Sequence, residues 1–486
     1  MLKRGFAALA LLVLLSTTGT PKDTSTVLDD AAKAIGSAEL KSLQYSGTGF
    51  MWIFGQSYLP GGKYPQFYLK YTRMLDYEKG LSREQYTRTQ WENPPRGAGG
   101  QPLYRPSPGN SVVSDSSPAW NGSVLALTPH GFIRAAKAAN ATVASKSVNG
   151  KPMSVVTFTA KGKYKVTGTI NAQNLVEKVE TSMPDPINGD ILIETSFSDY
   201  KDFGGVKVPM KIEQKQGAPG YVYPVLELNV KDVQPNAAVD IKPAEREGAV
   251  KVESTKIADG VWYLAGNPQP NAMAVEFKDF TMIIESSVSE ERALANLAEV
   301  RRLVPNKPVR YNLNSHHHSD HAAGVRGFIS EGMTIITHEM NKPFYEKVIL
   351  KAPHKLEPDK LAQNPKQAKF IWVKEKYVLS DGDRNLEIYS VHDAGHCANL
   401  LLSYLPKEKL LFITDIFNQF GVPRPNDPPP GVVTPYYAAL GENLKRLKLD
   451  VERIAPSHGR EVVSAAILTK ALEGKVEAPP VTPPAP

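Results

Sequence analysis

The segment NLNSHHHSDHAAG, which begins at Asn312, constrains the fold of this chain more than any other stretch. It continues PVRYNLNS, which has the pattern of a short strand, and it leads into DHAAGVRGFIS, which reads as a helix. A purification tag would lie at a terminus and would lack the acid, so a tag is excluded. The four histidines and one aspartate between His316 and His321 therefore belong at the end of a strand.

The spacing inside this cluster predicts two sets of metal ligands. In an extended segment, residues two apart project to the same side, so His316 and His318 can bind one ion together. Asp320 and His321 stand at the start of the helix and can hold a second ion. His317 faces the other way in this arrangement and is predicted not to be a ligand.

Three residues further along the chain complete the ligand set. His396 precedes a strand in VHDAGHCANLLLSYL, Asp415 ends an apolar strand in KLLFITDIFN, and His458 ends a short apolar run in VERIAPSHGRE. Folds of the α/β class collect their active-site groups in such loops at strand ends. Five histidines and two aspartates suffice for two three-ligand zinc sites that share a carboxylate and a water.

This order of motifs resembles the metallo-β-lactamase-fold superfamily of dinuclear zinc hydrolases, over about Val252 to Ala471. The resemblance implies an αββα sandwich with two zinc ions at one edge. It also assigns the ligands: His316, His318 and His396 to the first zinc, Asp320, His321 and His458 to the second, and Asp415 as the bridge between them.

The mechanism implied is metal-assisted hydrolysis. Two zinc ions lower the pKa of a bridging water, so that hydroxide is available near neutral pH. Asp320 is the predicted catalytic residue, because it can orient the hydroxide or take up its proton. True β-lactamases of this superfamily tend to carry Cys or Ser in place of Asp415. The resemblance therefore favours cleavage of an ester, thioester, lactone or related bond, and β-lactam hydrolysis is the alternative.

Residues around the ligands are harder to assign. A thiolate is a good zinc ligand, but Cys397 directly follows His396, and adjacent side chains in a tight loop diverge. Its role stays open. Tyr436, Tyr437 and Arg460 are candidate substrate contacts, and the sequence offers no way to choose among them.

The carboxy-terminal half has the order of strands and helices that is typical of an α/β fold. TMIIES is a short strand, SEERALANLAEVRRLV is a helix, and PVRYNLNS is a second strand, which together make a crossover unit. Ser287 and Glu290 stand at capping-box spacing before the helix. One helical face carries its apolar residues: Ala293, Leu297, Val300 and Val304.

The amino-terminal half is predicted to be mainly antiparallel β. KYKVTGTINAQNLVEKVETSMP and KVPMKIEQKQGAPGYVYPVLELNVKDV alternate apolar and polar residues. The Pro-, Gly- and Ser-rich stretch Asn93 to Ser117 is predicted to be a long loop. This half loosely resembles the half-barrels of lipoprotein-carrier-like periplasmic proteins. A second hypothesis is therefore a periplasmic binding or carrier protein with a vestigial hydrolase site.

At 486 residues the chain is too long for one ordinary core. We expect a signal peptide at 1–20, a β-rich, half-barrel-like domain at 24–245, the hydrolase domain at 250–475, and a proline-rich disordered tail at 476–486.

The first residues have the pattern of a secretory signal. Lys3 and Arg4 precede an apolar run from Gly5 to Leu15, and small polar residues follow. These 11 residues are too few to span a bilayer, which takes about 20. We therefore expect a periplasmic or secreted protein with no stable membrane insertion after signal removal.

The net charge and the cysteine content limit which partners and cross-links the chain can have. The formal net charge is +7, and removal of Lys3 and Arg4 leaves +5, which implies solubility and not a nucleic-acid partner. Export also argues against the RNA-processing branch of the superfamily. The expected partner is a small-molecule substrate, and the oligomeric state is open. The single cysteine excludes an intrachain disulfide.

Overall fold

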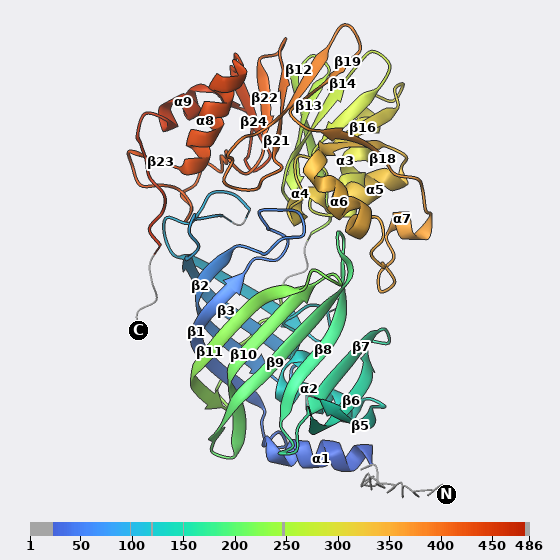
Figure 1. Cartoon of the computed structure of the whole chain (residues 1–486), viewed down its shortest axis with the longest axis vertical. Coiled ribbons are helices and arrows are strands. Elements are labelled where there is room, and N and C mark those ends of the chain that lie inside the picture. The colour runs from blue at the N-terminus through green and yellow to red at the C-terminus, as the bar shows by residue number, and fades with distance from the viewer. Residues whose placement is uncertain (1–22, 98, 118–119, 149, 245–247, 482–486) are drawn as a thin grey trace, which may run out of the picture.

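The chain forms two lobes, an antiparallel sheet and an α/β unit (Figure 1). The structure is a computed structural model that describes residues 23–97, 99–117, 120–148, 150–244 and 248–481. The predicted signal peptide at 1–20 lies outside these residues. Within them, no helix has both the length and the apolar character needed to cross a membrane.

The amino-terminal lobe is one 11-stranded sheet with the order β4-β3-β2-β1-β11-β10-β9-β8-β7-β6-β5. Its neighbouring strands are antiparallel throughout, as the alternating sequence pattern predicts. The strands are β1 Ser42–Trp52, β2 Gln66–Asp76, β3 Leu81–Gln90, β4 Ser107–Ser114, β5 Thr142–Val148, β6 Lys151–Ala160, β7 Tyr164–Ile170, β8 Val176–Asp185, β9 Gly189–Phe203, β10 Val206–Gly217 and β11 Tyr223–Pro235.

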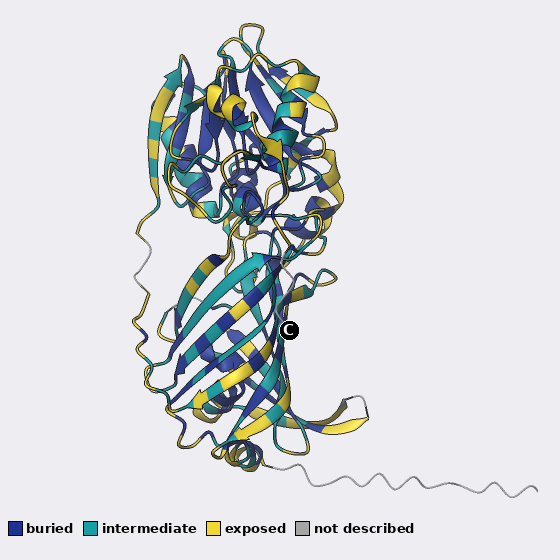
Figure 2. Cartoon of the chain, turned by 90° about the vertical axis from the view of Figure 1, so that its left-hand side faces the viewer, coloured by how far each residue is buried: buried dark blue, intermediate teal, exposed yellow. Residues whose placement is uncertain are grey.

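One face of this sheet carries the core of the lobe. Buried residues alternate with more exposed ones along the strands, which gives the banded pattern of Figure 2. Helices α1 (Thr24–Ala34) and α2 (Pro129–Ala138) pack on the buried face, together with the 3-10 turn η1 (Leu125–Leu127). Alternate strand residues point to opposite faces, so the sequence pattern itself determines which side is dry.

The prediction of one long loop from Asn93 to Ser117 was wrong in its second part. Residues Ser107–Ser114 form β4, which pairs with β3 from Arg88 to Leu81. β4 is one of the two edge strands of the sheet, where Pro108 and Gly109 are tolerated because one side of the ladder needs no partner.

His130, on α2, makes the stability of this lobe depend on pH. Its Nε2 lies 3.2 Å from the carbonyl oxygen of Ile35, and burial lowers its pKa from 6.5 to about 4. Between these two values the unfolded chain binds the proton more tightly, so stability falls as the pH drops from 6.5 towards 4. The shift predicts a loss of about 2 kcal/mol between about pH 7.5 and about pH 5. Urea unfolding gives the free energy of unfolding at both pH values. Its loss between them should be smaller by about 2 kcal/mol in His130→Gln than in wild type. Equal losses in wild type and variant would contradict the role of His130.

The carboxy-terminal lobe contains two stacked sheets. The first has the order β12-β13-β14-β15-β16-β17-β18 and the second the order β19-β20-β21-β22-β24-β25. The strands of the first are β12 Lys251–Ala258, β13 Val261–Asn267, β14 Ala272–Glu276, β15 Thr281–Ile284, β16 Val309–Leu313, β17 Thr334–His338 and β18 Lys369–Val373. Those of the second are β19 Lys376–Ser380, β20 Asn385–Ser390, β21 Leu401–Leu405, β22 Leu410–Ile413, β24 Arg453–Pro456 and β25 Val463–Ser464.

Helices cover the outer face of each sheet, which gives the αββα sandwich expected from the sequence. The first sheet packs against α3 (Glu290–Leu303) and α5 (Val325–Ser330), and the second against α8 (Pro435–Leu447) and α9 (Ala466–Ala471). A third core lies between the two sheets. Short helical turns complete the lobe: α4 Ser319–Ala322, η2 Glu339–Asn341, α6 Lys342–Phe344, η3 Tyr345–Ile349 and α7 Lys360–Gln363.

The predicted crossover unit is present, with β15 parallel to β16 and α3 between them. Its predicted capping box is displaced. The N-cap is Ser289, whose hydroxyl accepts a hydrogen bond from the Arg292 amide, and not Ser287. Ser287 has a φ of +66° and its hydroxyl instead accepts from the Asn296 amide group.

The start of the predicted tail is paired with the lobe. Strand β26 (Lys475–Val476) lies parallel to β23 (Val432–Val433), and the Tyr104 hydroxyl donates to the carbonyl oxygen of Glu477 at 2.6 Å. Residues 482–486 of the proposed tail lie outside the part of the chain that the structure describes.

Candidate metal centre

The structure brings the predicted ligands together in two adjoining groups. The ligand atoms of His316, His318, His396 and Cys397 all lie within 4.8 Å of one another, and so do those of Asp320, His321, Asp415 and His458. Each ligand segment follows a strand of one of the two sheets: β16, β20, β22 or β24. The groups therefore form where the strands of both sheets end along one edge of the sandwich.

Asp415 joins the two groups. Its Oδ2 lies 3.6 Å from Nε2 of His316 and 3.0 Å from Nε2 of His321. Its Oδ1 lies 3.5 Å from Nε2 of His396 and 3.3 Å from Nε2 of His458. One fully buried carboxylate is thus shared by a histidine pair on each side.

The backbone at Asp415 is adapted to this position. Its φ is +50°, a left-handed conformation that costs energy for a residue with a side chain. The Thr414 hydroxyl donates to its Oδ2 at 2.6 Å and in turn accepts from the Ser457 hydroxyl at 2.6 Å. Strained, over-determined residues of this kind cluster at functional sites.

The donor atoms fit a bound cation better than they fit one another. Nε2 of His316 faces Nε2 of His396 at 3.3 Å, and Nε2 of His321 faces Nε2 of His458 at 3.0 Å. Two ring nitrogens can share a hydrogen bond only if one of them carries a proton. Nδ1 of His318 and Oδ1 of Asp415 are buried and have no hydrogen-bond partner among the described residues. Such orphaned lone pairs are costly unless an ion binds them.

Electrostatics differ between the two groups. Burial lowers the pKa of His316 and of His318 well below the usual histidine value, so both rings are neutral and can act as ligands. Burial alone would lower the pKa of His321 as well, but the Asp415 and Asp320 carboxylates outweigh it and raise that pKa well above its usual value.

His458 behaves like His321. Burial would lower its pKa, but Asp415 and the hydrogen bond to Asp320 raise it to about 9. Burial would raise the pKa of Asp415, but the surrounding histidines, His321 first, hold it well below its usual value. Protons on two histidines thus balance the two carboxylates, and a metal cation binding there would displace those protons.

Residues 265–458 match a family model described as the Metallo-beta-lactamase superfamily. The carboxy-terminal domain belongs to this superfamily. The matched range contains all seven of the predicted ligands and ends at the last of them, His458.

Two curated proteins are similar to a short part of the chain. "Alkyl/aryl-sulfatase BDS1" of Saccharomyces cerevisiae is 36% identical over 76 residues, which cover 16% of this chain and 12% of that protein. "Linear primary-alkylsulfatase" of a Pseudomonas species is 34% identical over 76 residues, covering 16% of this chain and 11% of that protein. The similar stretch spans little more than a tenth of the length of either relative.

Solved structures of metallo-β-lactamases are similar to less than half of the chain. The enzyme from Pontibacter korlensis has a TM-score of 0.34 and 19% identity, over 46% of this chain and 97% of that one. The mono-zinc form of FIM-1 from Pseudomonas aeruginosa has a TM-score of 0.33 and 19% identity, over 45% of this chain and 92% of that one.

Within the metallo-β-lactamase domain, Glu285 is a supporting residue that the sequence did not reveal. It is fully buried, with a φ of +87°, directly after β15. Its Oε2 lies 2.8 Å from Nδ1 of His321 and accepts from the Ser315 hydroxyl at 2.8 Å, and that hydroxyl lies 3.0 Å from Nδ1 of His316. One carboxylate thus orients a histidine of each group, the usual arrangement behind histidine ligands. An acid at the end of the apolar run TMII was the available signal.

The other histidines of the motif region lie outside both groups. His317 is buried between Asn399 and Ser57, with its Nδ1 2.9 Å from the Asn399 side-chain oxygen. Its ring therefore faces away from both donor groups, which is the orientation that the spacing predicts. His392 lies 2.8 Å from a Glu375 carboxylate oxygen.

Cys397 is closer to the first group than adjacency in a tight loop suggested. The residue is 1% exposed, and burial raises the pKa of its thiol, which disfavours the thiolate form that binds zinc.

The predicted substrate contacts occupy different environments. Tyr436 is 1% exposed, its ring centroid lies 5.8 Å from that of His396, and its hydroxyl accepts from the Gly97 amide. Tyr437 donates its hydroxyl to the Asn418 carbonyl at 3.2 Å, and Arg460 is exposed. The Tyr436 ring therefore packs against His396, and contact of any of the three with substrate stays a prediction.

Proposed function

We propose that the protein is a zinc-dependent hydrolase that cleaves an ester, thioester, lactone or related bond of a small molecule. The observation that supports this most is the buried Asp415 carboxylate, which lies within 3.6 Å of histidines from both donor groups. Nitrogen and carboxylate donors are the set that suits zinc. Two zinc ions per chain would be held by His316, His318 and His396 on one side and by Asp320, His321 and His458 on the other, with Asp415 between them.

The chain's own groups have distinct tasks in this proposal. When bound, the two zinc ions would supply a water of lowered pKa and a Lewis acid for the substrate oxygen. The Asp320 side chain is 21% exposed whereas that of Asp415 is fully buried, so Asp320 is the carboxylate that can reach an incoming water. Its Oδ2 can orient that water and accept its proton.

A sulfate ester is a second candidate substrate. The two curated relatives are sulfatases by name, and a sulfate ester offers the same kind of polarised oxygen to a hydrolytic metal centre. β-Lactam hydrolysis remains an alternative, because a strained amide can be attacked in the same way. An aspartate at position 415 favours the ester-type reactions.

A panel of substrates tests the proposal. The purified protein, with its zinc content measured, is offered a p-nitrophenyl ester, a thioester, a lactone, a phosphodiester, an alkyl sulfate and nitrocefin. We expect the highest kcat/KM on the p-nitrophenyl ester, the thioester or the lactone. This rate should be lost after chelation and should recover with zinc. His316→Ala and Asp320→Ala proteins that keep both the full rate and the wild-type zinc content would refute it.

A cavity in the amino-terminal lobe supports a binding or carrier function as the alternative. It measures about 360 Å³, within the range of ligand pockets, and apolar side chains such as Leu43, Leu75 and Phe197 line it. The buried Arg73 at its wall already donates to Ser82 and to the Ser123 carbonyl. The cavity thus suits an apolar molecule with no anionic group. Retention of a fluorescent alkyl probe by the full chain, displaced by hydrocarbon ligands, would support this function.

We also propose that the protein is exported to the periplasm or beyond. The support is the Lys3, Arg4 and Gly5 to Leu15 pattern of the first residues. Detection of the chain in a periplasmic fraction, shortened near residue 20, would test it.

A further inference from the structure

A short segment of the amino-terminal lobe runs along the metal-binding motif. Residues Gly55 to Ser57 lie in the connection between β1 and β2. They form hydrogen bonds with residues 317–320 of the other lobe. The Ser319 amide donates to the Gly55 carbonyl at 3.0 Å, and the Ser57 hydroxyl lies 3.1 Å from Nε2 of His317. Figure 1 shows these connections of the sheet reaching the upper lobe beside α4.

Gln56 holds the catalytic candidate Asp320. Its side-chain amide donates to Oδ1 of Asp320 at 2.7 Å. The other carboxylate oxygen, Oδ2, is left facing Nε2 of His321 at 3.3 Å and Nε2 of His458 at 3.5 Å. The hydrogen bond therefore determines which oxygen of Asp320 points into the second donor group.

Gln56 is itself fixed in place. Its side chain is 6% exposed, and its Oε1 accepts a hydrogen bond from the Gly99 amide at 2.9 Å. Both ends of the amide are thus satisfied, one by the metal-binding lobe and one by a second loop of the amino-terminal lobe. A buried amide with both ends paired has one orientation and can transmit it to its partner.

The Ser57 carbonyl determines the tautomer of His318. A carbonyl oxygen only accepts, so Nε2 of His318, which lies 2.8 Å from it, must carry the hydrogen. In the neutral ring Nδ1 is then the free lone pair, and Nδ1 is the atom left buried without a hydrogen-bond partner among the described residues. The contact thus presents the correct nitrogen of a first-group histidine to an ion.

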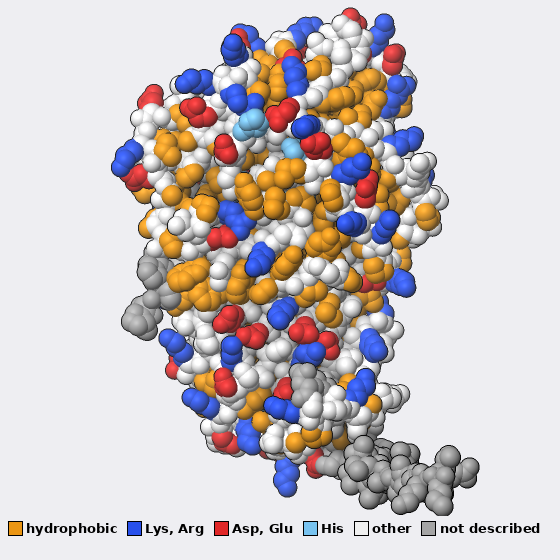
Figure 3. Space-filling model, in the orientation of Figure 1, with side chains coloured by type: hydrophobic (Ala, Val, Ile, Leu, Met, Phe, Trp, Pro, Cys, Tyr) orange, Lys and Arg blue, Asp and Glu red, His pale blue; other side chains and the backbone are white. Residues whose placement is uncertain are grey.

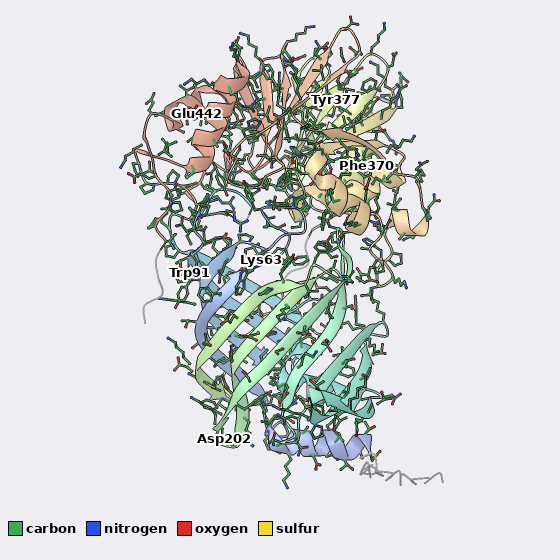
Figure 4. The ribbon with its side chains drawn as sticks, in the orientation of Figure 1. Lys63, Trp91, Asp202, Phe370, Tyr377 and Glu442 are labelled. Carbon is green, nitrogen blue, oxygen red and sulfur yellow. The ribbon has the colours of Figure 1, made fainter. Side chains whose placement is uncertain are left out.

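The second loop, between β3 and β4, closes over the same edge. The Gln101 side-chain amide donates to the Ile416 carbonyl at 3.0 Å, next to Asp415. Gly99 has a φ of +68°, and a Cβ placed there would lie 3.7 Å from Oδ2 of Asp320. Lys63 and Trp91, on these two connections, lie at the junction of the lobes in Figure 4.

Apolar contacts accompany these hydrogen bonds. Hydrophobic side chains gather across the middle of the face in Figure 3, where the lobes meet. Tyr58, which follows the Gly55 to Ser57 segment, accepts a hydrogen bond from the Ala398 amide through its carbonyl at 3.0 Å. The amino-terminal lobe therefore contacts the segments that follow His396 and Asp415 as well as residues 317–320.

We propose that Gln56 is a positioning residue of the metal centre, and that the amino-terminal lobe is a structural part of that centre. The inference rests on the proposed two-zinc hydrolase. It extends that proposal because it assigns the second zinc group to two lobes of the chain. Loss of the Gln56 contact would free Asp320 to rotate, while the first group keeps its own ligands and its contact with Ser57.

Zinc titration of full-length variants tests this positioning role. Competition with a chromophoric chelator gives the two zinc dissociation constants of wild type, Gln56→Leu and Gln56→Glu, the last of which keeps the size of the amide. We expect one of the two constants to rise about 10- to 100-fold in both variants, as is usual for residues that support metal ligands, with the other constant within about threefold of wild type. The matched control is Gln85→Leu, on β3 of the same sheet, with both constants unchanged.

A backbone variant provides an independent test. A Cβ on Gly55 would lie 2.6 Å from the Ser319 hydroxyl, so Gly55→Ala should displace the segment. Because this segment carries both the Gln56 and the Ser57 contacts, the variant should weaken zinc binding at both groups. Wild-type zinc constants in Gln56→Leu and Gln56→Glu would overturn the inference. An equal loss at both sites in these two variants, with circular dichroism that matches wild type, would also overturn it. If wild type itself binds no zinc, the proposed function fails. If wild type binds zinc and turns over substrate while both Gln56 variants match it, only the positioning role fails.

Discussion

Asp415→Ala protein is expected to bind at most one zinc ion and to lose hydrolysis by roughly 10³-fold, because a catalytic metal supplies several kcal/mol of transition-state stabilisation. The reason is geometric. The Asp415 carboxylate lies within 3.6 Å of four histidines: His316, His321, His396 and His458. Its removal therefore deprives both donor groups of their shared anionic ligand. Zinc per chain by mass spectrometry and kcat/KM on the best substrate of the panel would measure the two effects.

Asp383→Asn is a suitable control for this variant. Asp383 is an exposed carboxylate in the turn between β19 and β20 of the same lobe, and its replacement should change neither zinc content nor rate. Two zinc ions in Asp415→Ala, with a rate within a factor of three of wild type, would show that the bridging role is wrong. A smaller loss in Asp415→Asn than in Asp415→Ala would show that part of the role is carried by a side-chain oxygen atom, which asparagine retains and alanine lacks.

The seven donor residues of the centre could be predicted from the sequence because each of them lies close to the end of a predicted strand. His316, His318, Asp320 and His321 are nearly contiguous. His396 lies just before an apolar run that can be recognised as a strand, and Asp415 and His458 each end such a run. In the second sheet β20, β22 and β24 run in the same direction, and the donor atoms that follow them meet those that follow β16 of the first sheet. The pattern of apolar residues therefore carries both the fold class and the approximate placement of the seven side chains.

The supporting residues could not be predicted in this way. Gln56 precedes Asp320 by 264 residues, and no periodicity links a β-connection in one lobe to a helix start in another. Glu285 adopts a φ of +87°, which no rule of composition indicates for a glutamate. Both act through tertiary contacts: Gln56 between the two lobes, and Glu285 within the carboxy-terminal lobe. Their roles are therefore visible only in the folded structure.

The alternation pattern also did not predict the number of strands in the amino-terminal lobe or their register. The pattern identified β7, β8, β10 and β11, but β4 lies in a stretch rich in Pro and Gly and is stabilised by pairing with β3 instead of by its own propensity. The capping residue of α3 was displaced by two positions for a related reason. Ser287 is drawn into a hydrogen bond with Asn296, and this leaves Ser289 to accept the Arg292 amide.

Removal of zinc should lower the thermal stability of the metallo-β-lactamase domain. An ion that binds only the folded state stabilises it by about 4 kcal/mol when its free concentration is 1,000 times its dissociation constant. For a domain of this size, each kcal/mol shifts the Tm by roughly 2–4 °C, so a single ion at that excess predicts a shift of roughly 10 °C. Calorimetry of the zinc-saturated and the chelator-treated protein would measure the shift.

The identity of the ion and the site provides the controls for this experiment. Zinc should restore the Tm and magnesium should not, because magnesium prefers oxygen ligands and the first donor group offers histidine nitrogens. His316→Ala should show a much smaller shift, since it lacks a nitrogen that faces both His396 and Asp415. A Tm unchanged within about 1 °C on removal of measured, bound zinc would mean that the ion does not stabilise the fold, and the orphaned Nδ1 of His318 and Oδ1 of Asp415 would then need another explanation.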